Sequence, residues 1–235
     1  MKAYSSFGGR HELGQNHLIH RPTIGTIVDL VRATDGSVLE IGAGGGALTL
    51  PLARLDRDLL AVDIDPRSVD RLQRRLQRQP GVVVSHADAL SVPFDRNVIV
   101  GNIPYHLTTP ILRRLLASTQ WQDAVLLTQW EVARKRAGVG GGTMLTAQSA
   151  PWFQFALRGR VPASGFRPRP GVDGGVLTVR RRSVPLVDPA DRARYEKFVK
   201  HVFTGSGTGV GAVLAGVLGE PRRARALLAS AGVSP

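Results

Sequence analysis

Short apolar runs recur along the first three quarters of the chain, and segments with helical spacing separate them. The runs lie at residues 38–41, 59–62, 82–84, 97–101 and 124–127. Runs this short are typical of strands buried in a parallel sheet. Apolar positions at helical spacing precede the first run at residues 22–32 and lie between later runs at residues 66–79 and 109–117. The alternation predicts a doubly wound α/β sheet, which a strand pair at residues 152–157 and 175–179 closes.

The pattern changes near residue 184, where the strands stop. Helical spacing alone continues at residues 189–202, 210–217 and 220–231. Glycines separate these segments, at Gly205, Gly207, Gly209 and Gly211. We therefore expect two domains, an α/β domain over residues 1–184 and a small all-helical domain over residues 185–235.

A glycine-rich segment, Gly42-Ala43-Gly44-Gly45-Gly46, follows the first apolar run and opens a helix. Glycine lets the backbone pass close to a ligand where a Cβ atom would clash. Asp63 ends the next predicted strand, 21 positions after Gly42, where nucleotide-binding folds place an acid on the ribose hydroxyls. Loop and acid together indicate a nucleoside cofactor, although such a loop alone is often only a tight turn. Asp65 precedes Pro66 and can equally cap the next helix.

Two further polar positions end predicted strands. Asn102-Ile103-Pro104-Tyr105 follows the fourth apolar run, where open α/β sheets place their chemistry. The Asn102 carboxamide and the Ile103 carbonyl offer two acceptors for an exocyclic amine, and Tyr105 offers a face on which a base can stack. Asp88 ends the third run and can accept a hydrogen bond from an adenine amine. Taken singly, these motifs are also compatible with a proline turn and an Asx turn.

Six motifs, in this order and spacing, resemble the ribosomal RNA adenine N6-methyltransferases. They are Gly14-Gln15-Asn16 with Leu18, Glu40-Ile41-Gly42-Ala43-Gly44, Asp63, Asp88, Asn102-Ile103-Pro104-Tyr105 and Phe166-Arg167-Pro168-Arg169-Pro170. The resemblance covers residues 9–181 and is greatest to the erythromycin-resistance branch, which methylates one adenosine of the large-subunit (23S) ribosomal RNA. It implies S-adenosylmethionine as cofactor, a Rossmann-like methyltransferase fold with a small helical C-terminal domain, and resistance to macrolide-type antibiotics.

The resemblance also implies which residues bind the cofactor. From its methionine end to its adenine, these are Asn16, the Leu18 backbone, Gly42, Gly44, Asp63 at the ribose hydroxyls and Asp88 at the adenine amine. Asn102 would complete the set, because it would lie between the sulfonium methyl and the target amine.

Three residues are implied at the reaction itself. Asn102 would hold the target amine, while Tyr105 and Phe166 would cover the two faces of the flipped-out base. Neither a metal nor a dedicated base is expected, because the sulfonium is a good leaving group and the product proton can pass to water. Two positions depart from the family, since His17 stands where Phe is usual and Gly174 where Ser is common.

Composition agrees with an RNA partner. The chain has 31 Lys and Arg against 18 Asp and Glu, a formal net charge of +13 and a pI near 11.4. This bias suits phosphate backbones, although a solvated basic surface would give the same numbers. The candidate RNA contacts are the clusters that we expect beside the crevice, Arg113-Arg114, Arg134-Lys135-Arg136, Arg158-Gly159-Arg160 and Arg167-Pro168-Arg169.

Several classes of protein are excluded or disfavoured. The chain has no cysteine, which excludes disulfides, thiolate zinc sites and iron–sulfur clusters. Its six histidines are dispersed, which disfavours a metal site. With no apolar run near the ~20 residues of a membrane span and no signal peptide, we expect a cytoplasmic protein, and we expect a monomer.

Other functions remain open from the residues. The enzyme alternatives are a small-subunit rRNA adenine dimethyltransferase and a DNA adenine or protein glutamine methyltransferase, which usually has a second proline where this chain has Ile103. A non-catalytic RNA-binding factor with the same fold is the non-enzyme alternative, and the intact Asn16, Asp63, Asp88 and Asn102 argue against it. A dehydrogenase would share only the loop and Asp63.

Overall fold

The computed structural model describes residues 16–205 and 209–233. By their contacts, the residues form two compact units: one extends up to Gly140 and includes Gln154–Arg181, and the other consists of Gly141–Phe153 and the chain from Arg182 onward. The domain boundary expected near residue 184 stays a prediction. The division by contacts differs from it in assigning residues 141–153 to the C-terminal unit.

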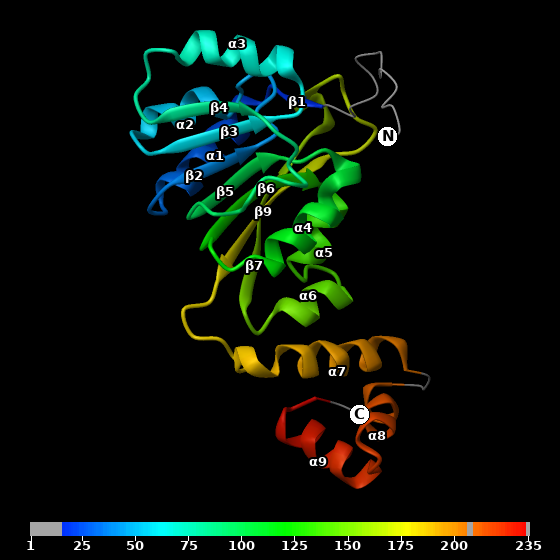
Figure 1. The fold of residues 1–235 in the computed structure, drawn as a ribbon. Helices are drawn as coiled ribbons and strands as arrows, with labels where there is room; N and C mark the ends of the chain where they lie inside the picture. The colour runs from blue at the N-terminus through cyan, green and yellow to red at the C-terminus, as the bar shows by residue number, and fades with distance from the viewer. Residues whose placement is uncertain (1–15, 206–208, 234–235) are drawn as a thin grey trace, which may run out of the picture. The chain divides into compact units, whose positions relative to one another are not determined.

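The first unit is built on a seven-stranded sheet with the order β4-β3-β2-β5-β6-β9-β7 (Figure 1). Strands β2 to β6 pair in parallel, and β9 runs antiparallel to β6. Their bounds are β2 Val38–Ile41, β3 Leu59–Asp63, β4 Val82–His86, β5 Val98–Asn102, β6 Asp123–Gln129, β7 Phe153–Val161 and β9 Gly174–Arg181. The parallel strands confirm the doubly wound sheet, and their short apolar runs follow from burial of both faces.

Helices connect the strands of this unit. They are α1 Arg21–Arg32, α2 Thr49–Leu52, α3 Pro66–Leu76, α4 Thr108–Ala117 and α5 Trp130–Arg136, with 3-10 turns η1 Ala53–Leu55, η2 Tyr105–Leu107 and η3 Ala163–Gly165. Helix α3 begins at Pro66 because the Asp65 carboxylate accepts hydrogen bonds from the Arg67 amide at 3.1 Å and the Ser68 hydroxyl at 2.8 Å. Asp65, which the sequence left ambiguous, is therefore a helix cap.

A two-stranded sheet joins segments that are far apart in sequence. Strand β1 His17–Leu18 pairs antiparallel with β8 Phe166–Arg167, so that His17 lies opposite Arg167 and Leu18 opposite Phe166. Leu18 and Phe166 are both 3% exposed and belong to the core. The pairing therefore fixes the start of the described chain to the segment that precedes β9.

The second unit is helical. It contains α6 Met144–Ser149, η4 Pro189–Asp191, α7 Arg192–Thr204, α8 Val210–Leu218 and α9 Pro221–Ser230. The helices expected after residue 184 are confirmed, whereas α6 was missed. The ring centroids of Trp152 and Tyr195 lie 5.6 Å apart, and the Gln148 amide donates to the Glu196 carbonyl at 3.0 Å. These contacts explain why α6 belongs with the C-terminal helices. Within the described ranges, no helix is long and apolar enough to cross a membrane.

Candidate active site

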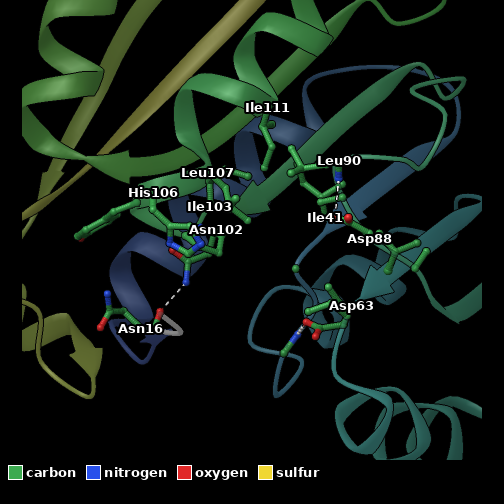
Figure 2. A pocket seen from close by; sticks show the side chains of 18 of the residues that line it. Asn16, Ile41, Asp63, Asp88, Leu90, Asn102, Ile103, His106, Leu107 and Ile111 are labelled. Carbon is green, nitrogen blue, oxygen red and sulfur yellow. Dashed lines mark hydrogen bonds between the residues drawn. The ribbon is translucent and has the colours of Figure 1, made fainter. Parts of the chain in front are cut away.

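A cavity of about 270 Å³ lies at the carboxyl ends of the central parallel strands (Figure 2). Seven of the nine predicted site residues line it: Asn16, Gly42, Gly44, Asp63, Asp88, Asn102 and Tyr105. Asn16 precedes β1, and the other six end or follow β2, β3, β4 and β5, whose carboxyl ends meet at one edge of the sheet. The sheet thus brings together motifs that span most of the first half of the chain.

The glycine-rich loop after β2 contributes one side of the cavity. Gly42 and Gly44 have φ values of +77° and +50°, a left-handed conformation that favours glycine. A Cβ atom on Gly44 would lie 3.3 Å from Nδ1 of His17, which lines the same cavity. The loop therefore needs glycine both for its backbone and for the space beside the His17 ring.

Asp63 stands next to this loop with its carboxylate held by backbone amides. Oδ2 accepts a hydrogen bond from the Gly44 amide at 2.7 Å, and Oδ1 accepts one from the Asp65 amide at 2.8 Å. The residue is 4% exposed, so the carboxylate has a fixed position. A carboxylate oxygen can accept more than one hydrogen bond, which leaves capacity for ligand hydroxyls.

Asp88 begins the loop between β4 and β5. Its Oδ1 accepts from the Leu90 amide at 2.8 Å, and its own carbonyl accepts from the Ser91 and Val92 amides at 2.9 Å. The Asx turn that the sequence allowed is therefore present, and Asp88 lines the cavity at the same time.

The Asn102 motif follows β5. Nδ2 of Asn102 donates to the Asn16 carbonyl at 2.7 Å (Figure 2). The Ile103 amide donates to the Leu127 carbonyl at 2.8 Å. Tyr105 is partly buried, and its hydroxyl has no partner among the described residues. Burial raises the pKa of this hydroxyl, and the negative charge of Asp173 adds to the rise, so that Tyr105 stays neutral at physiological pH.

Leu18 and Phe166 do not line the cavity. A Cβ atom on Gly174 would lie 2.8 Å from Cζ of Phe166, so the Phe166 ring occupies space that a serine at position 174 would fill. The departure from the family at Gly174 thus has a packing consequence. The predicted role of Phe166 at the target base stays a prediction.

Several cavity residues were missed from the sequence. They are mostly apolar neighbours of the predicted residues: Ile41, Val62, Ile64, Ala87, Ala89, Leu90, Pro104, His106, Leu107 and Ile111, together with His17. Ile64 is 49% exposed between Asp63 and Asp65, and an apolar residue between two acids at a strand end was the signal that could have identified it.

Glu40, the acid of the Glu40-Ile41-Gly42 motif, is buried in β2 below the loop. It is 1% exposed, and its Oε2 has no hydrogen-bond partner in the described part of the chain. Burial raises the pKa of Glu40 to about 8, and the negative charge of Asp63 contributes to the rise. Glu40 is therefore mostly uncharged near pH 7.

These features fit a nucleoside cofactor. Glycines shape one wall, buried Asp63 presents fixed oxygens, and apolar side chains such as Ile64 and Leu90 can flank an aromatic base. No cluster of metal-binding side chains occurs in the ranges that the structure covers. A sheet of this order with a glycine loop and strand-end acids defines the class of Rossmann-like S-adenosylmethionine-dependent methyltransferases.

The chain belongs to the ribosomal RNA adenine dimethylase family, whose model matches residues 6–233. It is 50% identical over 216 residues to an rRNA adenine N-6-methyltransferase of Corynebacterium diphtheriae, a match over 91% of this chain and 84% of that protein. It is 49% identical over 210 residues to the mycinamicin-resistance protein MyrB of Micromonospora griseorubida, over 88% and 67% of the two chains.

The solved structure of the 23S rRNA methyltransferase ErmE is similar with a TM-score of 0.85 and 36% identity, and the match covers 93% of this chain and 91% of that one. The predicted family, fold class, enzyme class and cofactor are thereby confirmed. The roles of individual site residues stay predictions.

Proposed function

We propose that this protein transfers a methyl group from S-adenosylmethionine to N6 of one adenosine in the large-subunit (23S) ribosomal RNA, and so confers resistance to macrolide-type antibiotics. The observation that carries the proposal is the placement of Asn102 and Tyr105 in one cavity with Asp63 and Asp88. The relatives at 50% and 49% identity support the reaction and the resistance. The likeness to ErmE supports the 23S substrate over small-subunit RNA.

In this proposal the chain binds the cofactor along the edge of the sheet. The Asp63 carboxylate accepts hydrogen bonds from the ribose hydroxyls. The Gly44 and Asp65 amides already hold its two oxygens in place. Asp88 accepts a hydrogen bond from the adenine amine. Asn16 and the Leu18 backbone hold the methionine end of the cofactor next to Gly42 and Gly44. The cofactor supplies a methyl group on a sulfonium that carries its own leaving group, so positioning is the main task of the protein.

Asn102 orients the target amine. Because its Nδ2 donates to the Asn16 carbonyl, its Oδ1 is left as the acceptor for one N–H of the amine, and the Ile103 carbonyl accepts the other. Two acceptors favour a pyramidal nitrogen, whose lone pair is then less delocalised into the ring. Positive charge that develops on the nitrogen is stabilised by these oxygens, and the extra proton leaves to water.

Tyr105 stacks on the flipped-out adenine. A neutral ring suits this role, and the raised pKa of its hydroxyl keeps it neutral. Phe166 covers the opposite face of the base; its ring packs beside Gly174 in this structure.

The RNA backbone binds to basic side chains of the first unit. Arg113 is exposed and is the candidate for a phosphate contact. Burial lowers the pKa of Arg136, and the positive charge of Arg113 contributes to the lowering. Arg134 pairs with Glu131 at 2.8 Å and Arg160 pairs with Asp173 at 2.7 Å, so each of these guanidinium groups already contacts a carboxylate. We further propose that the enzyme acts as a monomer in the cytoplasm, on protein-free or newly made RNA.

The test is to incubate the protein with labelled S-adenosylmethionine and, separately, protein-free 23S RNA, 16S RNA and duplex DNA, and to identify the methylated nucleoside after digestion. Label in N6-methylated adenosine from 23S RNA alone is expected. Label from 16S RNA or DNA would assign another substrate, and no label on any of them would favour a non-catalytic RNA-binding factor. Expression in a macrolide-sensitive bacterium, with Asn102→Ala as the inactive control, tests the resistance.

A further inference from the structure

The loop between β4 and β5, residues 87–97, forms the cavity wall that contains Asp88. Asp88, Ala89 and Leu90 all line the cavity, but the loop has no helix or strand of its own. Its internal hydrogen bonds are confined to the first turn, where Leu90, Ser91 and Val92 donate to Asp88. A wall built in this way depends on contacts from outside the loop for its position.

Arg114 of α4 supplies several of those contacts, beside the Ala87 amide, which donates to the Asp63 carbonyl at 3.0 Å, and the Ser118 hydroxyl, which donates to the Phe94 carbonyl at 3.3 Å. Its Nη1 donates to the Ala89 carbonyl at 2.8 Å and its Nη2 donates to the Val92 carbonyl at 3.0 Å. Its guanidinium carbon lies 4.7 Å from the centroid of the Phe94 ring. One planar group thus holds three points of an eleven-residue loop, and Arg provides this because its donors form a rigid fork. Bonds from a charged donor are also stronger than neutral ones.

Arg114 connects the Asp88 wall of the cavity to the helix that follows the Asn102 motif. Helix α4 follows directly on the Asn102 motif through η2, and Ile111, one turn before Arg114, lines the cavity itself (Figure 2). The helix that starts at the Asn102 motif is therefore also the helix that holds the Asp88 loop. Movement of α4 would shift the Asp88 wall with it.

We propose that Arg114 is a positioning residue that sets the selectivity of the cofactor site for a 6-amino purine. It holds the Asp88 loop so that the Asp88 carboxylate meets the adenine amine, and it does not contact RNA. The inference rests on the proposed function, because that proposal assigns the adenine amine to Asp88.

The neighbouring arginine provides a matched control. Arg113 is exposed, whereas Arg114 is partly buried and uses both terminal nitrogens within the protein. The sequence made the two residues equivalent candidates for RNA contacts. The structure separates them, and only Arg113 keeps a guanidinium group that faces solvent.

The experiment measures binding of S-adenosylhomocysteine and of S-inosylhomocysteine, whose purine has an oxygen in place of the amine, by calorimetry without RNA. The wild-type protein should bind S-adenosylhomocysteine about tenfold or more tightly than S-inosylhomocysteine. The Asp88 carboxylate receives a hydrogen bond from the purine amine of the first ligand but faces an oxygen, which cannot donate, in the second. In Arg114→Ala, affinity for S-adenosylhomocysteine should fall about tenfold and the preference should shrink to within about threefold. Arg114→Lys should fall between the two, since an amine cannot bridge both carbonyls.

Arg113→Ala should keep the wild-type preference in the same assay. Both ligands are measured on one preparation, so a smaller folded fraction does not change the ratio of the two affinities. An unchanged ratio in Arg114→Ala and Arg114→Lys, or an equal change in Arg113→Ala, would overturn the positioning role. A wild-type protein that binds both ligands equally would instead overturn the assignment of the adenine amine to Asp88, on which the inference rests.

Discussion

The two ends of the cavity differ in how their polar side chains are held. At the carboxylate end, formed by Asp63 and Asp88, each carboxylate accepts hydrogen bonds from backbone amides nearby. At the amide end, formed by Asn102 and Tyr105, Asn102 is held by the carbonyl of Asn16, 86 positions away, and the Tyr105 hydroxyl has no partner among the described residues.

This difference indicates a division of labour. Backbone amides fix the carboxylates before any ligand binds, so that the carboxylate end is ready for the cofactor and its residues should affect binding. The amide end depends on a distant segment and on a base that arrives with the RNA, so that its residues should affect the rate. The following substitutions would break or sharpen this contrast.

Asn102→Ala should have the largest effect. It removes the acceptor that orients the amine, and loss of one such group in other active sites lowers kcat about 100- to 1000-fold. Affinity for S-adenosylhomocysteine should change only a few-fold. The measurements are single-turnover methylation of 23S RNA and calorimetry, and a rate within tenfold of wild type would remove Asn102 from the reaction.

Asp63→Ala should weaken cofactor binding by about 1 to 3 kcal/mol, because a charge-assisted bond is lost. The Gly44 amide also loses its acceptor, so the loop should become less ordered. Asp65→Ala is the control, since Asp65 caps α3 and should change the thermal midpoint more than affinity. Equal affinity in the wild type and Asp63→Ala would contradict the ribose role.

Tyr105→Ala should remove about 1 to 3 kcal/mol of stacking free energy with the target base, and methylation should slow accordingly. Cofactor affinity should stay unchanged. Tyr105→Phe keeps the ring, and because the hydroxyl has no partner among the described residues and stays protonated, its rate and pH profile should match the wild type. A parallel loss of rate and cofactor affinity in Tyr105→Ala would mean that the ring supports the fold.

Glu40→Gln should have the smallest effect on methylation, and its effect should appear in stability. The pKa of Glu40 is raised from 4.5 to about 8 by folding, so the folded state keeps a proton that the unfolded state releases between these values. The free energy of unfolding should therefore fall as pH rises through this window, by about 1 kcal/mol per pH unit. Glu40→Gln should flatten that slope in urea titrations at pH 5, 6 and 7, whereas exposed Glu131→Gln should not.

The pattern of apolar runs predicted the parallel strands and the C-terminal helices, and the spacing of Gly42, Asp63 and Asp88 predicted that they share an edge of the sheet. These inferences succeeded because they depend on local periodicity and on the rule that parallel strands end together. Helix α6 was not found, since its position depends on contacts with residues that follow β9, such as that between Gln148 and Glu196.

The sequence by itself determined the order of elements and the residue types at the strand ends, because both depend only on residues close together along the chain. Tertiary structure alone decided which of two adjacent arginines faces solvent, that Asn102 is held by Asn16, and that Phe166 packs beside Gly174. Each of these outcomes depends on a contact between segments distant in sequence, and the sequence pattern of one segment does not specify which distant partner it meets.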